Sequence, residues 1–352
     1  MPLVLPNLRS LGLDRVAGIG PPAAAAPRGA YGRMAEASAG KDSVTGHWEM
    51  MGIVLDRPFP TFPGGFPPDV IAEFERRIGR GTIGNVVASG TEIIERLGTE
   101  HVRTGKPIVY TSADSVFQIA AHEEVIPIAE QYRICEAAFD LVGKGMGVGR
   151  VIARPFVGSA GTFKRTSNRH DYALAPFSDT LLDLLSRAGH PVVSVGKVND
   201  LFAGRGVTRS IPTISDDDGV SRVLDVMRDT PNGLIFANLV DFDTQYGHRN
   251  DVAGYAANLE RFDASLLTIV ESLRDGDLLA ITGDHGNDPT TPSTDHSREH
   301  VPLLLTGARV RPADLGTRST FADLGQTLAA NFGVGPLAHG TSFLGDLVVN
   351  PS

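Results

Sequence analysis

SDTLLDLLSRAGHPVVSVG, residues 178–196, combines a helix pattern with a strand pattern. A serine cap precedes the helical residues, a glycine ends them, and a β-branched run follows. Apolar strand patterns and amphipathic helix patterns continue this alternation at 233–240, 253–273, 277–286, 301–307 and 320–333. The alternation predicts an α/β fold with a doubly wound sheet, in which ligands collect beyond the carboxyl ends of the strands.

The middle of the chain breaks this alternation. Residues 56–69, DRPFPTFPGGFPPD, concentrate prolines and glycines, a composition typical of a linker or a domain edge. Short helical and extended patterns follow until the α/β alternation resumes. We therefore predict a smaller α+β cap domain at 58–177, inserted between core segments at 1–57 and 178–352.

Composition limits the class of protein. A length of 352 residues is sufficient for two domains, and the net charge of -9 gives no general attraction for nucleic acid. The single cysteine, Cys135, excludes a disulfide framework and fits a reducing compartment. The sequence shows no long apolar run and no signal-peptide pattern at its start. We expect a cytoplasmic protein that acts on small molecules, with no nucleic-acid, membrane or evident protein partner.

Acidic residues and histidines follow two of the predicted strands. NLVDFDTQYGHRND at 238–251 contains Asp243 and His248, and GDHGNDPTTPSTDHSREH at 283–300 contains Asp284, His285 and His296. Such side chains, converging from strand ends, can hold two divalent ions about 3.5 to 4 Å apart for phosphoryl displacement. Mixed nitrogen and oxygen ligands favour Mn²⁺ or Zn²⁺ over Ca²⁺. Any one histidine is also explained by a helix cap or a loop hydrogen bond, so only the full set indicates metal.

GKDSVTGHWEMMG, residues 40–52, places Thr45 before a glycine near an expected helix start. A threonine hydroxyl becomes a useful nucleophile only when a metal ion or a base activates it. The positive N-terminus of a helix would stabilise an alkoxide or a phosphate at that position. Read alone, this motif favours an ordinary N-cap role for Thr45 over a nucleophile, and both interpretations stay open on these residues.

These motifs, with SADSVFQIAAHEE at 112–124 and SNRHDYAL at 167–174, resemble the bacterial phosphopentomutase family of the alkaline phosphatase superfamily. The resemblance extends over about residues 6–345. It implies an alkaline-phosphatase-like core with an inserted cap. It also implies an isomerase that interconverts ribose or 2-deoxyribose 1-phosphate with the 5-phosphate, using two Mn²⁺ ions, a phosphothreonine and a sugar bisphosphate as candidate activator.

The resemblance also assigns roles to single residues. It makes Thr45 the phosphorylated nucleophile. The implied ligands are Asp243, His248 and His296 for one ion, and Asp284, His285 and the Thr45 oxygen for the other. The implied substrate contacts are Ser112, Asp114, Arg165 and Lys197. The cap is expected to close over the site and to exclude water.

The chain departs from the family at its beginning. Family members begin with a strand that ends in an Asp-Ser pair, whose aspartate joins the second ligand set. Here MPLVLPNLRSLGLDRV matches the family only after that strand, and Asp14 corresponds to a later position. We therefore expect the second ion to lack one carboxylate, the core sheet to lack one strand, and the chain as written to have feeble activity.

Alternative functions share the same metal chemistry. A metal-dependent phosphohydrolase or a cofactor-independent phosphoglycerate mutase is one class of alternative, and a catalytically weak metal-binding homologue is another. A sulfatase is disfavoured because Cys135 lies in a helical pattern, outside any CxPxR motif.

Overall fold

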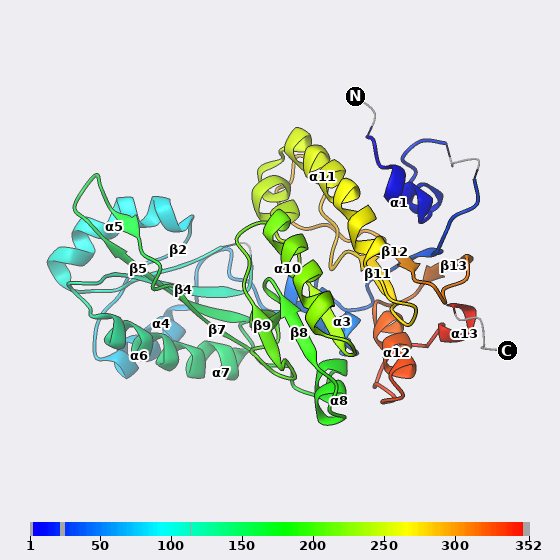
Figure 1. Ribbon diagram of the computed structural model, residues 1–352. Helices are drawn as coiled ribbons and strands as arrows, with labels where there is room; N and C mark the ends of the chain where they lie inside the picture. The colour runs from blue at the N-terminus through cyan, green and yellow to red at the C-terminus, as the bar shows by residue number, and fades with distance from the viewer. Residues whose placement is uncertain (1–2, 22–24, 113, 348–352) are drawn as a thin grey trace. The chain divides into compact units, whose positions relative to one another are not determined.

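The computed structural model describes residues 3–21, 25–112 and 114–347 (Figure 1). The chain divides into two compact units. We call Met1–Pro58 with Pro176–Ser352 the core unit, and Phe59–Ala175 the inserted unit. No helix in the described ranges is long and apolar enough to cross a membrane.

The described part of the core unit contains two sheets, not the one doubly wound sheet that the alternation predicts. A mixed sheet has the order β11-β12-β1-β13, formed by β11 (Leu279–Thr282), β12 (Val301–Thr306), β1 (Ala30–Met34) and β13 (Ala313–Arg318). A parallel sheet has the order β10-β8-β9, formed by β10 (Leu234–Ala237), β8 (Val192–Val195) and β9 (Arg209–Ile211). The fold is therefore α/β with a mixed sheet.

The mixed sheet has a local physical cause. A parallel crossover usually needs a helix to carry the chain back across the sheet. The polar segment 283–300 between β11 and β12 contains no helix, and β12 accordingly returns antiparallel to β11. Within the described residues β10 and β11 are edge strands, and all their residues are only half-buried.

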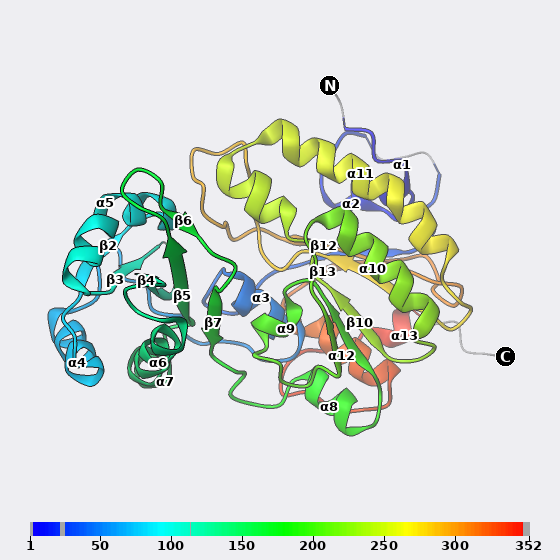
Figure 2. The same cartoon turned by 60° about the vertical axis from the view of Figure 1, so that its left-hand side comes forward.

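Helices cover the core strands from two sides. Helices α10 (Asp216–Asp229) and α11 (Val252–Glu271) pack against each other on one side, and α8 (Leu181–Arg187) and α12 (Ala322–Asn331) lie on the other (Figure 2). The remaining core helices are α1 (Pro6–Ser10), α2 (Leu13–Val16), α3 (Ser43–Met50), α9 (Val198–Leu201) and α13 (Leu344–Leu347). This covering is consistent with the helix and strand alternation of the sequence.

The cap of α8 differs from the predicted serine. The N-cap is Thr180, whose hydroxyl accepts from the Asp183 N–H while the Asp183 carboxylate accepts from the Thr180 N–H. This reciprocal capping box satisfies both backbone donors, so the helix begins after Thr180 and not after Ser178.

The inserted unit is a separate α+β structure. Its sheet has the order β2-β3-β4-β5-β6, formed by β2 (Ile83–Val87), β3 (Ile108–Thr111), β4 (Val116–His122), β5 (Arg150–Val157) and β6 (Lys164–Arg165), and β7 (His170–Ala173) pairs with β5. Its helices are α4 (Pro68–Ile78), α5 (Gly90–Thr104), α6 (Ile128–Ala138) and α7 (Lys144–Met146). Cys135 lies fully buried in its core, where burial raises the pKa of the thiol and makes it chemically inert.

Candidate metal centre

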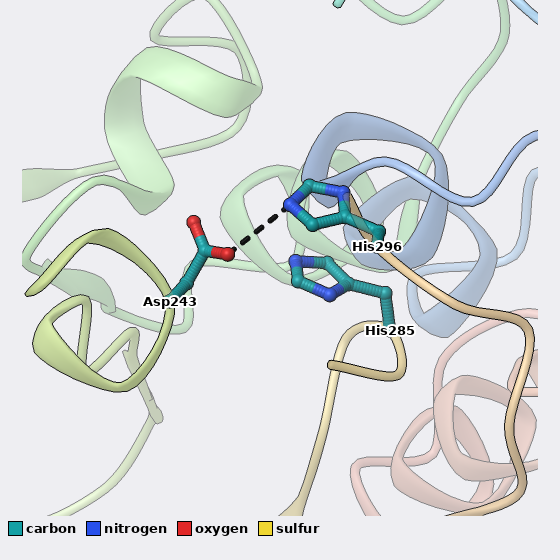
Figure 3. Close-up of side chains that lie close together, drawn as sticks. All are labelled: Asp243, His285 and His296. Carbon is teal, nitrogen blue, oxygen red and sulfur yellow. Dashed lines mark hydrogen bonds and ion pairs between the residues drawn. The ribbon is translucent and has the colours of Figure 1, made fainter. Parts of the chain in front are cut away.

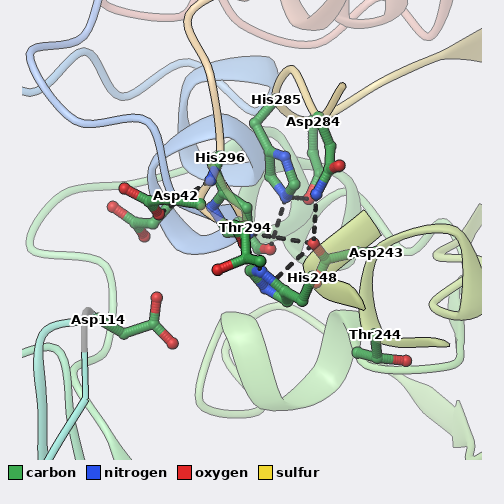
Figure 4. A network of polar contacts seen from close by, with 12 residues as sticks. Asp42, Asp114, Asp243, Thr244, His248, Asp284, His285, Thr294 and His296 are labelled. Carbon is green, nitrogen blue, oxygen red and sulfur yellow. Dashed lines mark hydrogen bonds and ion pairs between the residues drawn. The ribbon is translucent and has the colours of Figure 1, made fainter. Parts of the chain in front are cut away.

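The histidines and aspartates of the two polar segments come from the ends of core strands. Asp243 lies in the π-helical turn Phe242–Tyr246 shortly after β10, and His248 lies in the following 3₁₀ turn. Asp284 and His285 come directly after β11, and His296 lies in the loop before β12. Figure 4 shows these side chains gathered in one place.

Asp243 is at the centre of the first cluster. Its Oδ1 lies 3.1 Å from His296 Nε2 and 3.2 Å from His248 Nε2. The rings of His285 and His296 are stacked with centroids 3.7 Å apart. One donor atom from each of Asp243, His285 and His296 lies within 4.8 Å of the others, and Figure 3 shows the carboxylate facing both rings.

The outer nitrogens of these rings identify the tautomers. Nδ1 of His248 lies 2.6 Å from the carbonyl oxygen of Thr294, and Nδ1 of His296 lies 3.1 Å from that of Lys41. A carbonyl oxygen can only accept, so each Nδ1 carries the proton and donates it. A neutral ring then has a lone pair on Nε2, directed at the Asp243 oxygen. A nitrogen lone pair and a carboxylate oxygen 3.1 Å apart repel each other unless a cation binds to both. The Nε2 atoms and the Asp243 oxygen therefore fit the ligands of a metal ion.

Asp284 and His285 form the neighbouring cluster. Asp284 Oδ2 lies 3.6 Å from His285 Nε2 and 3.2 Å from Nδ1 of His47 on α3. His285 Nε2 also lies 3.1 Å from the Ser43 hydroxyl. Because His285 is also stacked on His296, it forms the boundary between the two clusters.

Both carboxylates are held in the ionised form. Burial alone would raise the pKa of Asp243, but when no cation is bound and the rings of His248 and His296 are protonated, their hydrogen bonds and positive charge outweigh it and hold the pKa well below its usual range. Burial likewise opposes ionisation of Asp284, and the neighbouring His285 and His47 lower its pKa below the usual value. Ionised oxygens beside imidazole lone pairs are the ligands that a divalent transition metal requires.

Thr45 lies in the first turn of α3 and is fully buried. The N-cap of this helix is Asp42, whose Oδ1 accepts from the N–H groups of Val44 and Thr45. Asp42 Oδ2 accepts the Thr45 hydroxyl proton at 2.6 Å. The interpretation of Thr45 as an N-cap is therefore wrong, because Asp42 already satisfies the free amides of the first turn.

Gly46 allows α3 to approach the candidate metal ligand Asp284 closely. A Cβ atom at this position would lie 1.7 Å from the carbonyl oxygen of Asp284. Only a residue without a side chain fits there, so Thr45 is held directly beside the turn that carries Asp284 and His285.

Comparison with known proteins identifies the family. A model of the metalloenzyme superfamily matches residues 35–336. The phosphopentomutase of Desulfitobacterium hafniense (strain DSM 10664 / DCB-2) is 58% identical over 348 residues, which cover 98% of this chain and 90% of that protein. The chain belongs to the phosphopentomutase family. A second family member, from Caldanaerobacter subterraneus subsp. tengcongensis, is 55% identical over 348 residues, or 97% of this chain and 88% of that protein.

Solved structures support the α/β fold of this phosphopentomutase-family chain. The PH0037 protein from Pyrococcus horikoshii aligns with a TM-score of 0.50 over 96% of this chain and 91% of that chain. The sequences are 17% identical, so this likeness concerns the fold alone.

The substrate contacts implied by the family resemblance lie on both units. Ser112, Asp114 and Arg165 belong to the inserted unit, and Lys197 precedes α9 in the core unit. Asp114 lies 3.8 Å from the guanidinium of Arg150. Their roles toward substrate stay predictions.

The sequence analysis missed several side chains that support the predicted site. His47 holds Asp284, Asp42 holds Thr45, and Arg298 binds the segment that leads into α3. An aspartate just before a helix is a recognised capping signal, so Asp42 was within reach of sequence analysis. The partners of His47 and Arg298 are more than 230 positions away in the chain, and no local pattern indicates them.

Proposed function

We propose that this chain is a phosphopentomutase, an isomerase that interconverts ribose or 2-deoxyribose 1-phosphate with the corresponding 5-phosphate. The observation that carries the proposal is a buried threonine, Thr45, beside the convergent Asp and His side chains, in a chain that is 58% identical over most of its length to a curated phosphopentomutase.

The metal ligands are proposed in two sets. Asp243, His248 and His296 would hold one Mn²⁺ ion, and Asp284, His285 and the Thr45 oxygen would hold a second. Mn²⁺ suits this mixture of imidazole nitrogen and carboxylate oxygen better than Ca²⁺ does. When bound, the ions supply Lewis acidity and lower the pKa of a coordinated hydroxyl.

Thr45 carries the transferred group in this proposal. Phosphothreonine passes its phosphoryl group to the free hydroxyl of a pentose monophosphate. The P–Oγ1 bond breaks as the new P–O bond forms, and the proton of the sugar hydroxyl passes to Oγ1, which leaves as the threonine hydroxyl. The resulting pentose bisphosphate turns round, and Oγ1 then takes the phosphoryl group from the other end. A sugar bisphosphate added to unphosphorylated protein acts as an activator by the same second step.

The surrounding residues orient the acceptor and keep water away from it. Asp42 Oδ2, 2.6 Å from Thr45 Oγ1, fixes the rotamer of the hydroxyl. Full burial of Thr45 favours transfer to a bound sugar over loss of the phosphate to water. Substrate contacts by Ser112, Asp114, Arg165 and Lys197 are part of the same proposal.

A matched pair of variants tests this function. Thr45→Val preserves the shape of the buried side chain but removes the hydroxyl, whereas Thr45→Ser retains a hydroxyl. With Mn²⁺ and a sugar bisphosphate, the wild type should convert ribose 1-phosphate to ribose 5-phosphate, Thr45→Ser should retain part of this rate, and Thr45→Val should have none. Release of inorganic phosphate in place of the 5-phosphate would identify a phosphohydrolase and contradict the proposal.

A further inference from the structure

Residues 36–41 connect β1 to α3 and belong to no strand or helix. Backbone groups enclosed in a protein need hydrogen-bond partners, and here side chains provide many of them. On one side, the carboxylate of Glu49 accepts from the N–H groups of Ala37 at 2.9 Å and Ser38 at 2.6 Å. Glu49 is fully buried on α3, so the segment is fixed to the same helix that carries Thr45.

Arg298 binds the other side of this segment. Its Nη1 donates to the carbonyl oxygen of Glu36 at 2.9 Å, and its Nη2 donates to those of Ser38 at 2.7 Å and Gly40 at 2.6 Å. The segment bends at residues 38–39, so its carbonyl groups converge, and the planar guanidinium with its several donors fits between them. The Glu36 carboxylate also lies 3.6 Å from Arg298. Arg298 thus fixes the bent shape of this segment.

Arg298 and the segment 36–41 connect the candidate nucleophile, Thr45, with a candidate metal ligand, His296. The segment leads into Asp42, which caps α3 and accepts the Thr45 hydroxyl proton. Arg298 follows His296 by two positions. Between them, Lys41 Nζ donates to the His296 carbonyl oxygen at 2.6 Å, and His296 Nδ1 donates to the Lys41 carbonyl oxygen at 3.1 Å.

We propose that Arg298 is a positioning residue that holds Thr45 at a fixed place relative to His296, through its bonds to the carbonyl groups of residues 36–40. Its kinetic consequence rests on the proposed mutase function. A displacement of about 1 Å at a reacting centre can reduce a rate by about 100-fold, whereas binding of the sugar needs no such alignment. Loss of Arg298 therefore lowers kcat and leaves KM nearly unchanged.

Arg274 is a matched control within the same unit. It also donates to backbone carbonyl groups, those of Met227, Arg228 and Thr230 at the end of α10. Arg274→Ala removes the same kind of contact from a helix end outside the candidate site. The experiment compares kcat, KM and thermal unfolding of Arg298→Ala, Arg298→Lys and Arg274→Ala, and adds millimolar guanidinium chloride to each variant.

We expect Arg298→Ala to lose about 100-fold in kcat with KM within about threefold, and added guanidinium to restore part of kcat. Arg298→Lys recovers less than guanidinium does, because one ammonium group cannot reproduce the planar arrangement of donors that binds the three carbonyl oxygens. Arg274→Ala should retain kcat. Unchanged kcat in Arg298→Ala overturns the proposal, as does a large rise in KM, which would make Arg298 a substrate contact.

Amide hydrogen exchange separates this inference from the proposed function. Arg298→Ala should speed exchange in residues 44–49 of α3 relative to wild type, and Arg274→Ala should not. This readout requires no turnover, so it decides the positioning role even if the wild type fails to interconvert pentose phosphates. Equal exchange of α3 in both variants overturns the positioning role.

Discussion

Gly46→Ala is the substitution whose effect follows most directly from the geometry. An added Cβ would lie 1.7 Å from the Asp284 carbonyl oxygen and 2.7 Å from its carbon, where ordinary contact begins at 3.4 Å. Helix α3 and the turn after β11 must therefore separate by at least 1.7 Å along that line. Because Thr45 lies on α3 and Asp284 lies in that turn, the distance between these two residues increases as well. We expect a loss of at least about 100-fold in kcat, together with a loss of about 1–3 kcal/mol in stability.

The sign of the stability change distinguishes a steric clash at Gly46 from an effect of helix propensity. In an unobstructed helix, Gly→Ala is stabilising by about 1 kcal/mol, so a loss at Gly46 reports the clash and not helix propensity. Gly276→Ala is the control, because nothing lies within 4 Å of its Cβ position. Steady-state kinetics and denaturant unfolding of both variants measure the two effects. A Gly46→Ala protein with wild-type kcat and stability would refute the described packing of α3 on Asp284.

Two further predictions concern metal and pH. His296→Ala should weaken metal binding by at least about 10- to 100-fold, measured by elemental analysis after dialysis, and a metal content equal to that of the exposed control His339→Ala would remove His296 from the ligand set. Burial raises the pKa of Glu36 to about 8 against opposition from Arg298, so between about pH 4.5 and 8 the folded state retains a proton that the unfolded state releases. Stability should fall by about 1.4 kcal/mol per pH unit as pH rises through that window, and Glu36→Gln should flatten this slope in denaturant unfolding; an identical slope would contradict the raised pKa.

Local patterns predicted some elements of the core and missed others. They indicated α8, β8, β10, α11, β11, β12 and α12, but not β1, β9, β13 or α10. The amphipathic stripe at 253–273 corresponds to α11 at Val252–Glu271, because periodic burial is encoded residue by residue. The pairing of strands is not local. Whether β12 runs parallel or antiparallel to β11 depends on the segment between them and on β1, which lies about 250 positions earlier in the chain. The alternation accordingly predicts one sheet for the core, where the described residues of the core unit form two.

The candidate site likewise combines residues that local patterns predict with contacts between residues far apart in the chain. The five candidate Asp and His ligands were predicted as a set because they lie in the two polar segments that follow the strands β10 and β11. Thr45 was predicted as the nucleophile from the family motif, but the residues alone did not separate this role from that of an N-cap, a role that the structure gives to Asp42. The support from Arg298 depends on backbone carbonyl groups 258 or more positions away, which no periodicity reveals.

The central claim is that Thr45 carries the phosphoryl group during pentose phosphate interconversion. Mass-spectrometric mapping of the protein after incubation with Mn²⁺ and a sugar bisphosphate tests it most directly. We predict one phosphorylated peptide, with the phosphate on Thr45, that loses its phosphate when ribose 5-phosphate is added in excess and is absent from Thr45→Val. Phosphate on another residue, or full turnover by Thr45→Val without any phosphopeptide, would contradict it.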